Sequence, residues 1–89
     1  MTPFDADRAW RLNPQVALRP EPFGALAYHY GNRRLTFLKT PTMVAAVRAL
    51  GERATAREAL VAVGVPESQW PAYERALAAL ADSEVIVAA

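Results

Sequence analysis

Side chains with catalytic or metal-binding chemistry are few in this chain. Its 89 residues include one histidine, His29, and no cysteine, so neither a thiolate site nor a multi-histidine metal site is available. No serine or threonine has a candidate base, and the four glycines form no phosphate-binding loop. We therefore expect a protein that is not an enzyme and that has no catalytic residue, metal or cofactor of its own.

Positive charge is concentrated in the first half of the chain, where it would attract an acidic partner. Residues 1–40 contain six Arg or Lys against three acids, whereas residues 41–89 contain four against six. Three of the six, Arg33, Arg34 and Lys39, flank a short run of β-forming residues. A surplus of this size does not indicate nucleic acid by itself, but it suits a short acidic partner.

Membrane signals are absent from the sequence. Its uncharged apolar stretches are about seven residues long, whereas a helix that spans a bilayer needs roughly 20. The first ten residues carry acidic and basic side chains by turns, unlike a signal peptide. We expect a cytoplasmic protein without a membrane partner.

The segment from Ala25 to Lys39 has the pattern of a β-hairpin. Two runs of β-forming residues flank Gly31-Asn32, which suits a two-residue turn because both residues tolerate positive φ. This turn places four large apolar residues on one face: Leu26, Tyr28, Leu35 and Phe37. The opposite face is small or polar apart from Leu38, and it carries His29, which we expect to be solvent-exposed. We predict that the large apolar face packs on the core.

Two further short elements are predicted before the hairpin. Phe4–Arg11 suits one helical turn capped by Asp5 and ended before Pro14. Gln15–Arg19 alternates as a strand and is followed by a tight connection through Phe23. With the hairpin, this strand makes an antiparallel meander of three strands.

After the hairpin the apolar period changes from 2 to 3.6, which predicts helices. The first has Thr40 as its N-cap and Pro41 at the first helical position, and it ends at Gly51. The second begins with a capping box, in which the Thr55 hydroxyl and the Glu58 carboxylate each accept a free backbone N–H.

The third helix begins near Ser68, has Pro71 in its first turn and ends at Ser83. Its apolar stripe, which is either core or binding surface, consists of Trp70, Tyr73, Leu77 and Leu80. Residues 85–87 are either a terminal strand or a packed tail. The order of elements predicts one α+β domain over residues 1–89, winged helix-turn-helix-like, with a three-stranded antiparallel sheet followed by three helices.

A helix-turn-helix often indicates DNA binding, but the charges of this one do not favour it. The recognition helix would be residues 68–81, whose charged residues are Glu74 and Arg75, with Glu67 just ahead. Binding in a DNA groove relies on several Lys or Arg contacts. We therefore expect no nucleic-acid partner, and we retain a DNA-binding winged-helix regulator as the alternative function.

The outer edge of the strand from Arg33 to Lys39 has two interpretations. Its backbone N–H and C=O groups lack an obvious partner, because no later segment clearly has the pattern of a fourth strand. The flanking basic residues either protect the edge against aggregation or attract an acidic peptide that adds as a further strand. The pattern supports both equally and indicates a small interaction domain.

Two segments carry a family resemblance, namely Arg19-Pro20-Glu21-Pro22-Phe23-Gly24 and Gly31-Asn32-Arg33-Arg34-Leu35. Together with the remainder of Trp10–Pro41 and the Gly64-Val65-Pro66 turn, they resemble the PqqD-like MftB peptide chaperones over nearly the whole chain. The resemblance implies a domain that recognises the leader of a ribosomally made precursor peptide in mycofactocin biosynthesis. It implies that this domain binds the leader as an extra strand and delivers the precursor to a radical SAM maturase.

Carried over by position, the resemblance also implies which residues bind the acidic leader. The backbone of residues 33–39 would pair with the peptide, basic side chains would meet its carboxylates, and the third helix would provide an apolar wall. The implied set is Arg33, Arg34, Leu35, Thr36, Phe37, Leu38, Lys39, Trp70, Tyr73 and Leu77. No cofactor is implied for this chain, which agrees with its lack of cysteine.

Overall fold

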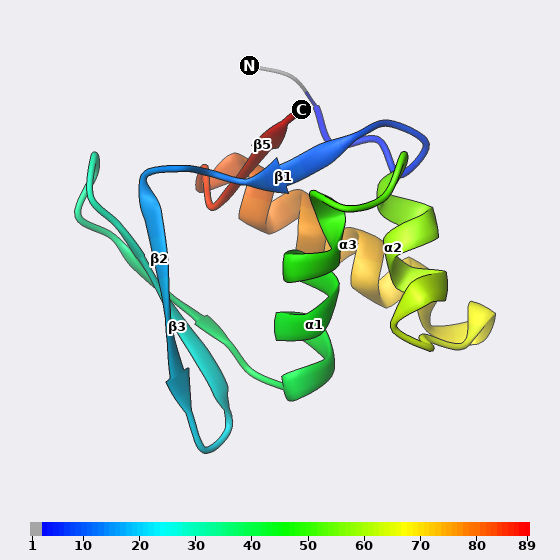
Figure 1. The fold of residues 1–89 in the computed structure, drawn as a ribbon, viewed down its shortest axis with the longest axis horizontal. Coiled ribbons are helices and arrows are strands. Elements are labelled where there is room, and N and C mark those ends of the chain that lie inside the picture. Colours follow the sequence, from blue (N-terminus) through cyan, green and yellow to red (C-terminus); the bar gives the residue numbers. More distant parts are fainter. Residues whose placement is uncertain (1–2) are drawn as a thin grey trace.

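The computed structural model describes residues 3–89, so residues 1 and 2 of the expected domain lie outside the described part. The elements in chain order are β1 (Trp10–Leu12), β2 (Val16–Glu21), β3 (Gly24–His29), β4 (Leu35–Leu38), α1 (Pro41–Leu50), α2 (Ala56–Ala62), a 3₁₀-helix η1 (Glu67–Gln69), α3 (Trp70–Asp82) and β5 (Ile86–Ala88) (Figure 1). The α+β class, with a three-stranded antiparallel sheet and three α-helices in residues 3–89, is confirmed.

Two antiparallel sheets organise the chain. One contains β2, β3 and β4 in that order, so β2 and β4 are its edges. The other pairs β1 with β5 and joins the two ends of the chain. Helix α1 contacts both sheets and α2, and Figure 1 shows it between the β2–β3 hairpin and α2. The hydrophobic core therefore lies around α1, α2, α3 and the inner faces of both sheets.

The first strand was not predicted, because Phe4–Arg11, which overlaps it, was expected to form a helical turn. Asp5 does organise a turn, since its carboxylate accepts the Asp7 N–H at 2.9 Å and its carbonyl accepts the Arg8 N–H at 3.1 Å. The chain then extends into β1, where Trp10 is buried and pairs opposite Ala88. Pairing with a strand from the far end of the chain decided the structure of this segment.

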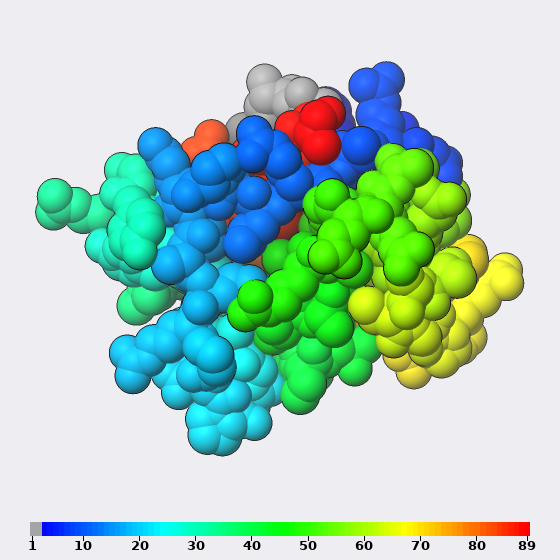
Figure 2. Space-filling view, viewed as in Figure 1, coloured from blue at the N-terminus to red at the C-terminus, as the bar shows by residue number. Residues whose placement is uncertain are grey.

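The register of the predicted hairpin is confirmed, but its turn is longer than expected. Tyr28 lies opposite Leu35, Leu26 opposite Phe37 and Ala25 opposite Leu38. The His29 N–H donates to the Arg34 carbonyl, and the Arg33 N–H donates to the His29 carbonyl. The connection is thus a four-residue loop, residues 30–33, in which Arg33 has φ of 62°. Figure 2 shows this end of the hairpin (teal, left) projecting from the molecule.

The prediction that the large apolar face of the hairpin packs on the core is wrong. Leu35 and Phe37 are each 60% exposed, whereas Ala25, Ala27 and Leu38 are buried. Helix α1 packs against β3, and small side chains on that strand let the helix backbone approach closely. The large side chains of Leu35 and Phe37 therefore lie on the face of the hairpin that points away from α1. The count of apolar side chains was a poor guide to which face is covered.

His29 is buried, at 4% exposure, and the expectation that it is solvated is wrong. Its Nδ1 accepts the backbone N–H groups of Gly31 at 2.9 Å and Asn32 at 3.2 Å. The Asn13 side-chain nitrogen lies 3.2 Å from Nε2 and donates to the Glu84 carbonyl at 2.9 Å. The imidazole thus ties the hairpin loop to the region where β1 ends and β5 begins, which is a structural role.

The predicted starts of the first two helices are confirmed by their caps, whereas the third α-helix begins at Trp70, after the η1 turn, and has no side-chain cap. The Thr40 hydroxyl accepts the Met43 N–H at 3.1 Å, and both hydrogen bonds of the Thr55–Glu58 capping box are present. Gly64 ends the second helix segment with φ of 82°. Residues 86–88 form a strand, the first of the two alternatives expected for the C-terminal segment.

Candidate functional site

A groove of about 490 Å³ separates the free edge of β4 from helix α3. Its lining consists of Thr36, Phe37, Leu38 and Lys39 from β4 and the residue after it, Thr40 and Met43 at the start of α1, and Ala72, Tyr73, Ala76, Ala79 and Leu80 from α3. The lining is mostly apolar, and Lys39 is its only charged member. A groove of this shape, open along one strand edge, suits an extended chain rather than a compact small molecule.

Strand β4 offers unpaired backbone groups to this groove. Hydrogen-bonded and non-hydrogen-bonded pairs alternate along an antiparallel ladder, and the His29–Arg34 pair is hydrogen-bonded. The N–H and C=O groups of Thr36 and Leu38 therefore face β3, and those of Leu35 and Phe37 face outward. Within residues 3–89, no further strand pairs with this edge. The edge is open to a partner.

Three of the five α3 residues that line the groove are alanines. Ala72, Ala76 and Ala79 follow the i, i+4, i+7 spacing and share one face of α3. The half-buried Tyr73 borders this alanine face, and Met43 reaches the groove from α1. The methyl groups leave space for apolar side chains of a bound segment, and the flexible thioether of methionine can adapt to their shape.

Basic side chains stand at both ends of β4. Arg33 and Arg34 precede the strand, Lys39 follows it, and all three are exposed. The four ion pairs in residues 3–89 involve Arg8, Arg19 and Arg57, so none of the three residues beside β4 is paired there. Their charge is available to carboxylates of a ligand.

The structure brings together part of the predicted site. Thr36, Phe37, Lys39 and Tyr73 line the groove, as does Leu38, whose side chain is buried. Arg33, Arg34 and Leu35 lie at the hairpin end beyond the lining residues.

Trp70 and Leu77 do not line the groove. Leu77 is fully buried in the core. The Trp70 Nε1 donates to the Val65 carbonyl at 3.0 Å, and its ring faces the Arg57 guanidinium at 5.9 Å. Both residues belong to the side of α3 that packs on the rest of the protein.

The groove residues that sequence reasoning missed are Thr40, Met43, Ala72, Ala76, Ala79 and Leu80. Leu80 had been assigned to the apolar stripe of the third helix but not to the site. Successive helical residues are rotated by roughly 100°, so Ala76 points well away from Leu77. A run of alanines spaced i, i+4, i+7 beside the large apolar stripe was the available signal.

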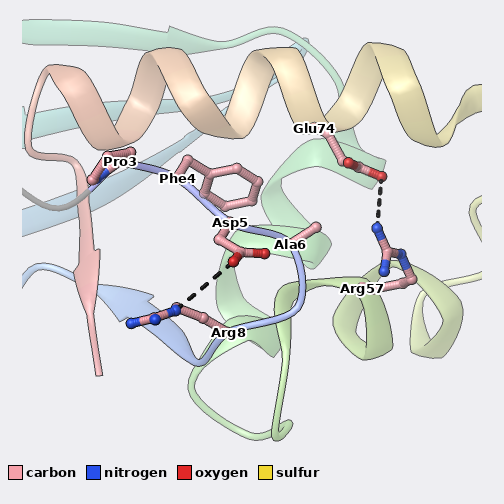
Figure 3. Close-up of a pocket in the computed structure, with 7 residues that line it drawn as sticks. All are labelled: Pro3, Phe4, Asp5, Ala6, Arg8, Arg57 and Glu74. Atoms are coloured by element: carbon pink, nitrogen blue, oxygen red, sulfur yellow. Dashed lines mark ion pairs between the residues drawn. The ribbon is translucent and has the colours of Figure 1, made fainter.

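A second hollow, of about 540 Å³, lies between the N-terminal segment, α2 and α3 (Figure 3). Its charged side chains are paired with one another, since Arg57 lies 3.6 Å from Glu74 and Arg8 lies 3.8 Å from Asp5. Arg57 also pairs with Asp7. These contacts join the N-terminal segment to the helices and leave little free charge for a ligand, so the β4 groove is the better candidate.

Comparison with known proteins identifies the family. Residues 9–87 match the family described as the peptide chaperone MftB family. The chain belongs to this family. The peptide chaperone MftB of Mycobacterium ulcerans is 52% identical over 84 residues, which cover 94% of this chain and 77% of the relative.

Two more MftB relatives have similar identity. The peptide chaperone MftB of Mycolicibacterium smegmatis is 51% identical, with 94% of this chain and 82% of the relative covered. That of Mycobacterium tuberculosis is 50% identical, with 94% and 77% covered. No solved structure matches the chain.

Membership in the MftB peptide chaperone family agrees with the expectation that the chain is not an enzyme, because a chaperone role is non-catalytic. The resemblance found in the Trp10–Pro41 segment is likewise confirmed. In the described part of this MftB-family chain, no helix has the length and hydropathy needed to cross a membrane.

Proposed function

We propose that this MftB-family chain binds the leader of the mycofactocin precursor peptide as a strand added to β4 and delivers the precursor to a radical SAM maturase. The single observation that supports this most is the open edge of β4 facing α3 across an apolar groove. The chain contains no cysteine to hold an iron–sulfur cluster, so the redox chemistry belongs to the maturase.

Backbone pairing would supply the general part of the affinity. The outward N–H and C=O groups of Leu35 and Phe37 would exchange hydrogen bonds with the leader, each contributing about 0.5–1.5 kcal/mol net. Side chains of a strand alternate between its two faces, so every second residue of the leader would point into the groove. Each large apolar side chain buried there would contribute about 1.5–3 kcal/mol before the cost of ordering the peptide.

The basic residues beside β4 would favour an acidic peptide over a second copy of this chain. In an antiparallel pairing of two β4 edges, Arg33 and Arg34 of one copy would approach Lys39 of the other. Like charges placed opposite each other disfavour such a pairing. A leader with carboxylates at both ends of its bound segment would instead be attracted, and this attraction would mainly raise its rate of association. The charges thus act both in protection and in recognition.

The alternative function, DNA binding, has less support from the arrangement of α3. Leu77 faces the core, and Ala72 and Ala76 face the groove. Glu74 pairs with Arg57. This leaves Arg75 as the one basic residue of α3 for a phosphate backbone, whereas duplex binding requires several.

The test is an NMR titration of the ¹⁵N-labelled protein with a synthetic peptide that has the sequence of the mycofactocin precursor leader. We expect amide shifts in residues 35–39 and on the alanine face of α3. Hydrogen exchange should slow at Leu35 and Phe37, which gain partners, and change little at Thr36 and Leu38, which are already paired. A scrambled leader is the control. Shifts confined to the surroundings of Arg57, or uniform protection along β4, would contradict strand addition.

A further inference from the structure

A patch of large apolar side chains lies on the face of the sheet opposite the groove. Leu35 and Phe37 of β4 are each 60% exposed, and Phe23, in the turn between β2 and β3, is 42% exposed. The rings of Phe23 and Phe37 meet edge to face, with centroids 6.0 Å apart. Exposed apolar residues that adjoin one another mark an interaction surface more often than single ones do.

This outer patch has a hollow of its own. A depression of about 360 Å³ is lined by Phe23, Phe37 and Lys39. Phe37 and Lys39 also line the groove, because the backbone of β4 runs between the two. The groove and the outer hollow therefore lie on opposite faces of the same strand edge, and a segment placed on that edge would adjoin both.

The geometry points to a peptide that is recognised on both of its faces. Resting on the proposed strand addition, we infer that alternate residues of the bound peptide enter the groove, and that the residues between them pack on Phe23 and Phe37. The period of two along any strand requires this division, since a side chain that does not face the groove must lie over the outer patch. The preferred ligand is thus an extended peptide with apolar side chains at both odd and even positions.

Charge complementarity selects the peptide over another occupant of the patch. Lys39 lines the outer hollow and has no ion-pair partner within residues 3–89, and Arg33 and Arg34 stand exposed at the other end of β4. Two copies stacked through this face would bring these like charges together. A peptide whose apolar segment is flanked by carboxylates meets both the aromatic rings and the charges.

Phe23 offers a clean test of this inference because it lies outside β4 and does not line the groove. We expect Phe23→Ala to weaken binding of the synthetic leader roughly three- to tenfold by calorimetry, because the peptide would lose the apolar contact that the Phe23 ring provides at the outer hollow. Val61→Ala is the matched control, since Val61 is 58% exposed on α2, outside the sheet. Circular dichroism should show both variants folded like the parent.

A double-mutant cycle distinguishes the two faces of the peptide. Leader variants with single alanine substitutions would be measured against Phe23→Ala and against Ala76→Leu, which alters the groove. We expect the leader positions that couple to Phe23 to alternate with those that couple to Ala76. Because Phe37 lines both the groove and the outer hollow, Phe37→Ala should couple to the leader positions that couple to Phe23 and also to those that couple to Ala76.

Each result separates this inference from the function on which it rests. If Phe23→Ala and Phe37→Ala bind the leader with parental affinity while Ala76→Leu does not, strand addition stands and recognition by the outer patch is refuted. If the parent does not bind the leader at all, the proposed function fails and this inference fails with it. If Phe37→Ala changes only the sedimentation of the free protein, from dimer to monomer, the patch is a self-association surface and the inference is overturned.

Discussion

Replacing Ala76 by Leu fills the proposed groove from its helix side and leaves the edge of β4 unchanged. Ala76 is half-buried, lies on the alanine face of α3 and lines the groove. A groove of about 490 Å³ has room for the added side chain, so overpacking is not expected. Leucine is also close to alanine in helix propensity. The free energy of unfolding should therefore stay within about 1 kcal/mol of the parent value or rise.

Binding of the leader should change in the opposite direction. The leucine side chain would occupy the space of one apolar residue of the peptide, whose burial is worth about 1.5–3 kcal/mol. Every 1.4 kcal/mol is a factor of about ten in affinity, so Kd should rise by roughly ten- to a hundredfold. The protein would thus keep its stability and lose its ligand, a combination that general damage to the fold does not produce.

Calorimetric titration with the synthetic leader, together with urea unfolding, measures both quantities on the same samples. Ala45→Leu is the matched control, because Ala45 is exposed on α1 and does not line the groove. Ala45→Leu should leave both the Kd for the leader and the free energy of unfolding close to the parent values. Unchanged affinity in Ala76→Leu would show that no peptide side chain enters the groove beside α3, and a large loss of stability would show that the space beside Ala76 is already filled.

Three substitutions in the β3–β4 hairpin, at Gly24, His29 and Arg34, give further tests, and Gly64→Ala is the control for the first of them. Gly24→Ala should lower the free energy of unfolding, measured in urea, by more than about 2 kcal/mol, because the added Cβ would overlap the Leu38 carbonyl oxygen. Gly64→Ala, at positive φ with no atom within 4 Å, should lower it by only about 1 kcal/mol. Equal losses in the two variants would refute the close approach of the Gly24 and Leu38 backbones. His29→Ala should lower the free energy of unfolding by about 2–4 kcal/mol, because two loop N–H groups lose their acceptor and a cavity remains. An unchanged free energy of unfolding would mean that water replaces the ring. Arg34→Glu should weaken leader binding several-fold at low salt and less at high salt, and binding equal to that of the parent at low salt would leave edge protection as the role of the charge.

Features set by neighbouring residues could be predicted from the sequence. Thr40 and Pro41 begin a helix, Thr55 and Glu58 form a capping box, and Gly64 ends a segment, because each signal acts through backbone groups a few residues away. The hairpin register was predicted for a similar reason, since alternation in two adjacent runs allows one pairing. The turn was less predictable, because a loop of four residues preserves the same register as one of two.

The candidate site was only partly predictable. The open edge of β4 was predicted from the sequence, because no later segment clearly had the pattern of a fourth strand beside it. The face of α3 that meets this edge was not predicted. Leu77 and Ala76 are neighbours in sequence, yet one is in the core and the other lines the groove. Periodicity shows which helix residues share a face, but the neighbours of each face depend on how the helix is oriented in the fold.

The sequence by itself determined the helices, the hairpin register and the family, all of which depend on local spacing and motifs, but it did not determine β1, whose partner strand lies at the far end of the chain. Tertiary structure decided which face of the hairpin is covered. Close packing of α1 selects the small face with Ala25 and Ala27, and it leaves Leu35 and Phe37 exposed. Burial is a matter of fit between two surfaces as well as of hydrophobicity, and fit exists only once both surfaces are assembled. The same packing that excludes the large residues from the core places them beside the open edge.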